Sequence, residues 1–153
     1  MGRFIRFART ASSLSLALLS FAALAQEMPV GLWKTVDDKT GQPNSLVRIV
    51  ESQGVLSGRI EKLLRKPGED QNPLCNDCGG DLRGAPLRGM PIIAGMKKED
   101  EKPVWSGGTL LDPKTGKTYK STMELIDGGK KLYVRGYIGI PLFGHSQVWE
   151  RPQ

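Results

Sequence analysis

Histidine and cysteine are scarce in this chain of 153 residues, which contains one histidine and two cysteines. Nucleophilic hydrolysis by a triad needs a histidine held by a recognisable motif, and a structural zinc site needs four ligands. His145 precedes Ser146 without a Gly-x-Ser-x-Gly motif, and the two cysteines supply half of a zinc site. We therefore predict no catalytic residue, no metal and no cofactor. An enzyme acting through Arg135, Tyr137 or His145 is the least favoured alternative.

Clusters of one charge are also missing. The chain has 22 basic and 16 acidic residues, a formal net charge of +6. Three of the basic residues are Arg3, Arg6 and Arg9, in a segment that we expect to be removed, so the remainder carries +3. The other Lys and Arg residues are scattered, whereas nucleic-acid binding needs them gathered on one face. We expect no nucleic-acid partner.

Long apolar runs are missing except near the start, where residues 11–24 form a run too short for the roughly 20 residues that span a bilayer. Three arginines precede this run, and Ala23-Leu24-Ala25 ends it, the pattern of a secretory signal peptide. Lipid attachment would need a cysteine at the cleavage point, and the first is Cys75. We predict a signal-peptide helix at 1–25, a single mature domain at 26–153 without a transmembrane segment, and export to the periplasm, with secretion as the alternative.

The mature chain lacks the spacing of apolar residues typical of an amphipathic helix, since every window of a dozen residues with that spacing is interrupted by Gly or Pro. Runs of β-forming residues alternate with turn residues instead. We expect eight strands, at Val30–Val36, Leu46–Ser52, Val55–Leu64, Gly89–Lys97, Val104–Leu111, Lys117–Ile126, Lys131–Ile140 and Ser146–Glu150. The predicted fold class is all-β.

Turns rich in Asp and Gly separate several of these strands, at residues 37–41, 112–116 and 127–129, and are typical of hairpins. Eight strands joined mostly by hairpins favour an antiparallel up-and-down barrel, which has no exposed sheet edge; a sandwich is the alternative. Alternation along the strands places one set of side chains inside. The inward set is Leu56, Gly58, Ile60, Tyr119, Ser121, Met123, Leu125, Leu132, Val134, Gly136 and Ile138.

Short motifs along nearly the whole mature chain resemble those of one family. They are Gly31-Leu32-Trp33-Lys34-Thr35-Val36-Asp37-Asp38, Ile60-Glu61-Lys62-Leu63-Leu64, Cys75-Asn76-Asp77-Cys78, Trp105-Ser106-Gly107-Gly108, residues 111–119 and residues 134–139. In these the chain resembles the small exported bacterial proteins of the domain of unknown function 2147 family, which has no established activity. The resemblance implies a lipocalin-like barrel with Trp33 at its floor beneath a basic residue of the last strand. Arg151 is the candidate, and Arg135 is its competitor.

Both cysteines lie in a long connection, residues 65–88, that is rich in Pro, Gly and Asp. In an oxidising compartment a disulfide between Cys75 and Cys78 is the favoured interpretation. A redox-active pair would need a helix N-terminus in a βαβ setting, and a metal site would need two chains to share an ion.

The interior of an eight-stranded barrel is either filled by side chains or holds one small ligand, and the sequence leaves both open. Candidate ligand-binding residues are Trp33, Trp105, Tyr119, Met123, Arg135 and Tyr137. We expect a non-catalytic binding protein for a small apolar or amphipathic ligand. The alternative is a filled barrel that contacts an envelope protein through the Cys75–Cys78 loop or through Leu142 and Phe143.

Overall fold

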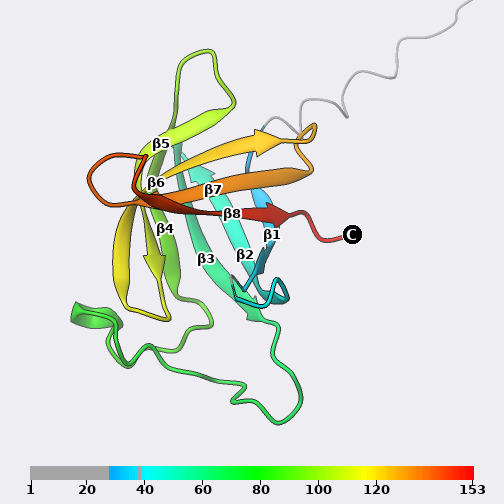
Figure 1. The fold of residues 1–153 in the computed structure, drawn as a ribbon, viewed down its shortest axis with the longest axis vertical. Coiled ribbons are helices and arrows are strands. Elements are labelled where there is room, and N and C mark those ends of the chain that lie inside the picture. Colours follow the sequence, from blue (N-terminus) through cyan, green and yellow to red (C-terminus); the bar gives the residue numbers. More distant parts are fainter. Residues whose placement is uncertain (1–27, 38) are drawn as a thin grey trace, which may run out of the picture.

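The computed structural model describes residues 28–37 and 39–153. Its eight strands form a closed barrel in chain order, and this confirms the predicted all-β antiparallel fold (Figure 1). The strands are β1 (Gly31–Val36), β2 (Pro43–Ser52), β3 (Val55–Leu63), β4 (Pro91–Lys98), β5 (Val104–Asp112), β6 (Lys117–Ile126), β7 (Lys131–Tyr137) and β8 (Gly144–Glu150). The predicted signal peptide, residues 1–25, lies outside the described residues.

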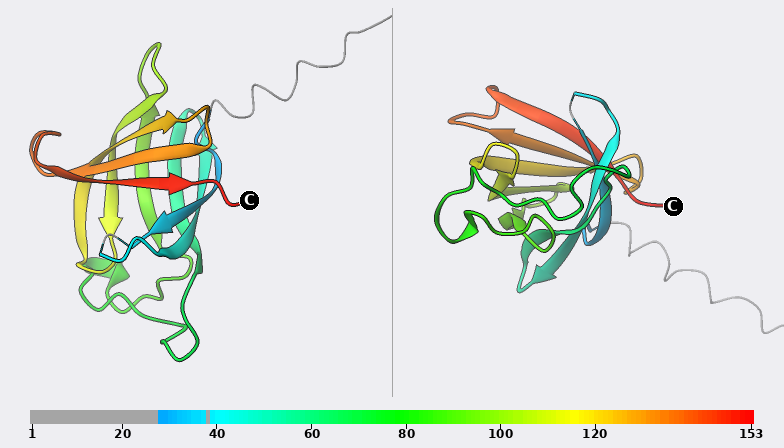
Figure 2. Two further views of the ribbon diagram at one scale, coloured as in Figure 1. Left: turned by 45° about the vertical axis from the view of Figure 1, so that its right-hand side comes forward. Right: turned by 90° about the horizontal axis from the view of Figure 1, so that it is seen from below.

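Each strand pairs antiparallel with the next, but the seam that closes the barrel is short. Within the described part of the chain, the register of β1 against β8 consists of Lys34 opposite Glu150, whose side chains also form an ion pair with 3.6 Å between Nζ and Oε2. By contrast, β7 and β8 pair from Lys131 opposite Glu150 to Tyr137 opposite Gly144. The barrel is therefore closed near the C-terminal end of β8, while the rest of β8 diverges from β1 (Figure 2).

Two of the predicted hairpin turns are held by aspartate side chains. Asp37 Oδ1 accepts the backbone N–H groups of Lys39 and Thr40, each at 3.0 Å. Asp112 Oδ1 accepts the N–H of Lys114 at 2.9 Å, and its other oxygen accepts the Thr115 hydroxyl at 2.8 Å. These turns lie between β1 and β2 and between β5 and β6, so they stand at the same end of the barrel.

The bounds of several strands differ from the prediction, most of all around the last hairpin. β7 ends at Tyr137 and β8 begins at Gly144, so Ile138 belongs to the connection. The prediction that Ile138 is buried inside the barrel is wrong, because 67% of it is exposed and it lies at the rim. Its N–H donates to Phe143 O at 3.3 Å inside a tight loop, so the strand alternation has already ended. At their starts, β2 begins three residues earlier than predicted and β4 two residues later.

The packed core fills the part of the barrel nearest the short seam. Its buried side chains come from most of the strands and include the predicted inward residues Leu56, Met123 and Leu132; Ile60 and Val134 are also buried and border the cavity described below. The largest are Trp33, Trp105, Ile49, Leu56, Ile93, Met96, Met123 and Leu132. Burial of so much aliphatic and aromatic surface is the main stabilising contribution in a domain of this size.

The long connection between β3 and β4 folds back on itself below the barrel (Figure 1). It contains the short 3-10 helix η2 (Gly80–Leu82) and an isolated bridge between Leu74 and Pro86. A disulfide joins Cys75 to Cys78, and both residues are buried. The Cys75 sulfur lies 3.3 Å from Pro113 O, so this loop is docked against the β5–β6 turn.

Candidate ligand-binding cavity

The end of the barrel where β1 begins and β8 ends is closed by Trp33 and Arg151. The guanidinium carbon of Arg151 lies 4.3 Å from the centre of the Trp33 ring, a cation–π contact. Arg151 also donates to Gly129 O at 2.9 Å, Met28 O at 2.9 Å and Val30 O at 3.1 Å. Partial burial lowers the pKa of Arg151, but a guanidinium stays charged at neutral pH.

A glycine is required at residue 31, two residues before Trp33, because the Arg151 side chain lies close to its backbone. Gly31 has a φ of +121°, and a Cβ placed on it would lie 2.9 Å from Nη1 of Arg151. The indole N–H of Trp33 donates to Pro29 O at 2.7 Å, which ties the ring to the chain entering β1. These contacts close this end of the barrel.

The opposite end of the barrel holds a cavity of about 670 Å³, within the usual range for small-molecule sites. Its apolar wall combines side chains of several strands with residues of the β7–β8 loop. They include Ile60, Ile92, Leu110, Val134, Ile138 and Phe143. The barrel is thus packed at the floor and hollow at the mouth, a combination of the two outcomes that the sequence left open.

One corner of the cavity is polar and uncharged. Thr35 on β1 and Ser45 on β2 share a hydrogen bond of 2.7 Å between their hydroxyls, and Thr35 Oγ1 also bonds Asn44 Oδ1. Thr35 and Ser45 are 5% and 7% exposed, so these groups are shielded from bulk water. The corner could bind the hydroxyl, amide or carbonyl group of an otherwise apolar molecule.

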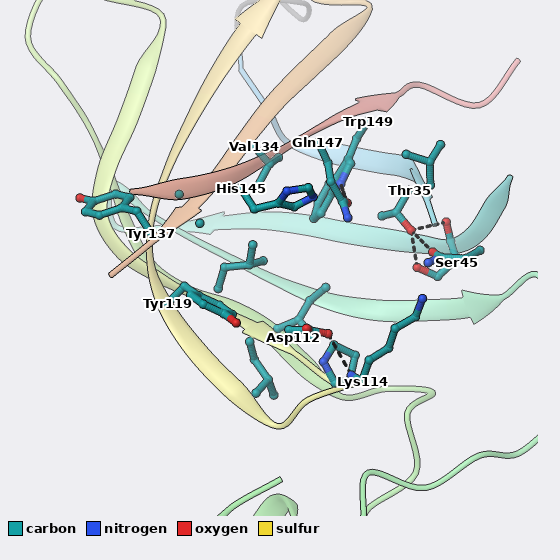
Figure 3. Close-up of a pocket in the computed structure, with 18 of the residues that line it drawn as sticks. Thr35, Ser45, Asp112, Lys114, Tyr119, Val134, Tyr137, His145, Gln147 and Trp149 are labelled. Carbon is teal, nitrogen blue, oxygen red and sulfur yellow. Dashed lines mark hydrogen bonds between the residues drawn. The ribbon is translucent and has the colours of Figure 1, made fainter. Parts of the chain in front are cut away.

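Strand β8 supplies the wall on the side of the incomplete seam. His145, Gln147 and Trp149 alternate along it and line the cavity (Figure 3). The indole N–H of Trp149 donates to Gln147 Oε1 at 2.8 Å, which orients the amide. Tyr119 on β6 lies across the cavity from them (Figure 3).

An ion pair joins opposite sides of the mouth. Lys114, in the β5–β6 turn, donates to Asp37, the residue directly after β1, and Lys114 also lines the cavity. The hydrogen bond from Lys114 is the largest cause that lowers the pKa of Asp37 to about 2, and the backbone N–H groups of Thr40 and Lys39 lower it further. The carboxylate is therefore ionised throughout the neutral range.

We expect the Lys114→Gln substitution to raise the pKa of Asp37 towards its ordinary value, because the largest cause of its depression is removed. In the wild type, the ionised carboxylate stabilises the folded state above about pH 4, and this contribution is lost as the pH falls through about 2. In the variant the loss should begin at higher pH. Carbon NMR of the Asp37 carboxyl measures both titrations; identical curves would contradict the ion pair.

The six residues predicted to bind ligand occupy three different places. Tyr119 and Tyr137 line the cavity. Trp33, Trp105 and Met123 are buried in the packed core and are absent from the cavity wall. Arg135 is bonded to the β7–β8 loop, donating to Pro141 O at 2.6 Å and Leu142 O at 3.2 Å. Of the two arginines that could pack on Trp33, it is Arg151 that does.

Several cavity residues were missed, although the same alternation that located the core points to them. Thr35 follows Trp33 at the inward period on β1, and Ser45 precedes Val47 and Ile49 at that period on β2. On β8, Gln147 shares the face of Trp149, and so does His145, which the sequence offered as a candidate residue of the enzyme alternative. In the sequence, polar residues at inward positions near the end of a strand therefore indicate that this end of the barrel is hollow and partly polar.

Two other kinds of feature are absent from the described residues. Within 28–37 and 39–153, no group of three or more His, Cys, Asp or Glu side chains is placed to hold a metal ion. Over the same residues, no helix has the length and apolar character needed to cross a membrane.

Comparisons with known proteins agree with this geometry. The Helicobacter pylori protein HP1028, described as belonging to the lipocalin family, matches with a TM-score of 0.69 and 17% sequence identity, covering 82% of this chain and 84% of its own. At that identity the likeness shows the fold. No curated protein matches. The model of a family described as uncharacterized proteins conserved in bacteria matches residues 31–151, and the chain therefore belongs to this family, DUF2147.

Proposed function

We propose that this protein is a non-catalytic binding protein that holds one small amphipathic molecule in the mouth of its barrel. The observation that carries the proposal is the cavity of about 670 Å³, lined mostly by aliphatic and aromatic side chains. Apolar walls with a few placed polar groups are the usual composition of small-molecule sites. The lipocalin-like fold supports the same interpretation.

The distribution of polar groups indicates which molecules fit. Lys114 is engaged by Asp37, and the buried corner of Thr35, Asn44 and Ser45 is uncharged. An apolar body would lie against Ile60, Ile92 and Leu110 while a neutral hydroxyl, amide or ester bonds the corner. A full charge placed in that corner would lose hydration without gaining an opposite charge.

The sequence of residues 1–25 supports a place of action outside the cytoplasm, in the periplasm or beyond the cell. There, an apolar molecule would need a carrier to cross water. The filled-barrel alternative, in which the protein is purely an interaction module, is less favoured because the mouth half is hollow.

The test is to recover the native ligand. Native mass spectrometry of protein purified from its own cells should show an added mass, and solvent extraction should release one amphipathic class of compound. A variant with Ser45→Val and Thr35→Val should retain apolar compounds but lose preference for those with a neutral polar group. Repeated recovery of empty protein that also fails to take up a fluorescent neutral lipid would overturn the proposal.

A further inference from the structure

The connection between β7 and β8, residues Ile138–Phe143, exposes an unusual amount of apolar surface; we call it the lip. Ile138, Ile140, Leu142 and Phe143 are 67%, 54%, 75% and 70% exposed. They account for half of the exposed large hydrophobic residues in the described chain. The lip extends away from the strands, as the orange-red loop in Figure 2 shows. Apolar clusters of this kind mark surfaces that contact a partner or a membrane.

The lip is held in one shape rather than left free. Ile138 N–H donates to Phe143 O at 3.3 Å, and Phe143 N–H donates to Ile140 O at 3.1 Å. Arg135 reaches from β7 to bond the carbonyls of Pro141 and Leu142, and its third contact is the Ser146 hydroxyl at 2.7 Å. Ordering the backbone in advance lowers the entropic cost of binding through these side chains.

The charged side chains nearest the lip are basic. The hairpin from residue 132 to residue 149 contains Arg135 and no acidic residue. On the adjoining strand β6, Lys117 and Lys120 lie at the end nearest the lip, whereas Lys114 in the preceding turn is paired with Asp37. Lys120 lies opposite Tyr137 in the β6–β7 register, directly beside the lip. An aromatic ring and cationic groups flanking apolar side chains are the arrangement found at the polar boundary of a bilayer.

From these observations we propose that the lip inserts into the surface of an anionic phospholipid bilayer. A stable protein interface buries about 800 Å² on each partner, from 20 or more residues. The lip has four exposed apolar side chains on a narrow six-residue turn, which suits acyl chains better than a protein face. The flanking lysines and Tyr137 would then lie among the phosphate groups.

The lip is also continuous with the cavity, because Ile138 and Phe143 line its mouth as well as being exposed. A molecule leaving the bilayer could pass along these side chains into the barrel without crossing water. This transfer step rests on the proposed function, whereas docking of the lip does not.

The first experiment locates the lip relative to lipid. A polarity-sensitive fluorophore is attached to Leu142→Cys and, as a matched control, to Lys102→Cys in the β4–β5 connection at the other end of the strands. The full-length chains are mixed with vesicles of equal parts phosphatidylglycerol and phosphatidylcholine carrying brominated acyl chains. The label at 142 should shift to the blue and be quenched, while the label at 102 should not change.

Two results would overturn the docking proposal. One is an identical spectrum of the label at 142 with and without vesicles. The other is shielding of that label that rises with protein concentration in the absence of lipid, since a second copy of the chain would then be its occupant. Weaker quenching with pure phosphatidylcholine is expected, because the lysines would lose their anionic partners.

The second experiment separates docking from ligand binding. The double variant Ile140→Asn, Leu142→Asn removes exposed apolar surface from the lip without changing a residue of the cavity wall. The control is Val50→Asn, which removes exposed apolar surface from the outer face of β2, where 44% of Val50 is exposed. The double variant should bind the anionic vesicles at least about tenfold more weakly than the wild type and the Val50→Asn control. Residues 1–25 are common to all three chains, so a difference in vesicle binding between them comes from the substituted surface.

Uptake of a fluorescent neutral lipid from aqueous solution is measured on the same proteins. The double variant should take it up normally but acquire it more slowly from vesicles. Vesicle binding equal to that of the wild type in the double variant would overturn the lip proposal and leave the cavity proposal intact. Vesicle binding by a wild type that takes up no lipid would support the lip and overturn the proposed function.

Discussion

Replacing Arg151 with leucine should destabilise the barrel by about 2–4 kcal/mol, because the substitution removes three charge-assisted hydrogen bonds and a cation–π contact together. The carbonyls of Met28, Val30 and Gly129 would lose their donor, and the Trp33 ring would lose its cover. Leucine keeps much of the apolar stem, so the loss reports mainly on the guanidinium. Urea unfolding followed by tryptophan fluorescence measures it.

Two further variants make this result specific. Arg151→Lys keeps the charge but cannot reach three carbonyls with a planar fork, so it should recover less than half of the loss. Arg135→Leu removes the other arginine that the sequence offered as a partner for Trp33; its bonds are to the exposed lip and to the Ser146 hydroxyl on β8. Its cost should stay below about 1 kcal/mol. A larger loss from Arg135→Leu than from Arg151→Leu would contradict the floor described above.

Replacing Gly136 with leucine should lower the affinity for a cavity ligand at least about tenfold. Gly136 lies on the cavity wall in β7, and a Cβ placed there would lie 3.3 Å from Tyr119 Cβ and 3.6 Å from Leu110 Cδ2. A longer side chain must therefore extend into the space that the ligand would occupy. Titration with a fluorescent neutral lipid measures the affinity, and thermal unfolding checks that the barrel remains folded.

Gly136→Ala is the matched control, because it adds the Cβ alone and should keep affinity near that of the wild type. Thr122→Val, on the outer face of the neighbouring strand β6, should leave both affinity and stability close to wild type. If the leucine variant unfolds, Tyr119→Phe still tests the cavity, since it changes one polar group on the wall without changing volume. Unaltered affinity in a folded leucine variant would place the ligand elsewhere.

Much of the fold followed from local chemistry. Alternation on β3, β6 and β7 identified the buried faces, because successive side chains of a strand point to opposite sides whatever the strand packs against. Asp37 and Asp112 marked their turns because an aspartate side chain bonds backbone N–H groups only two or three residues away. These interactions act over short stretches of chain, so the sequence shows them directly.

The cavity residues were only partly predictable. Tyr119 was placed in the interior correctly, but Trp33, Trp105 and Met123, on the same kind of inward face, belong to the packed core. Alternation tells which face a side chain occupies but not how far along the barrel axis it lies. That height depends on strand register and on the short pairing of β1 with β8, both of which are set by tertiary contacts.

The sequence by itself determined that the chain is built from eight antiparallel strands, because strand period and turn residues are local properties. Only the tertiary structure decided that Arg151 rather than Arg135 covers Trp33, that the barrel is packed at one end and hollow at the other, and that Ile138 leaves the sheet to join an exposed lip. Each of these depends on residues far apart in the chain meeting in space. Arg151 donates to the carbonyls of Met28, Val30 and Gly129, and no local sequence pattern predicts this set of partners.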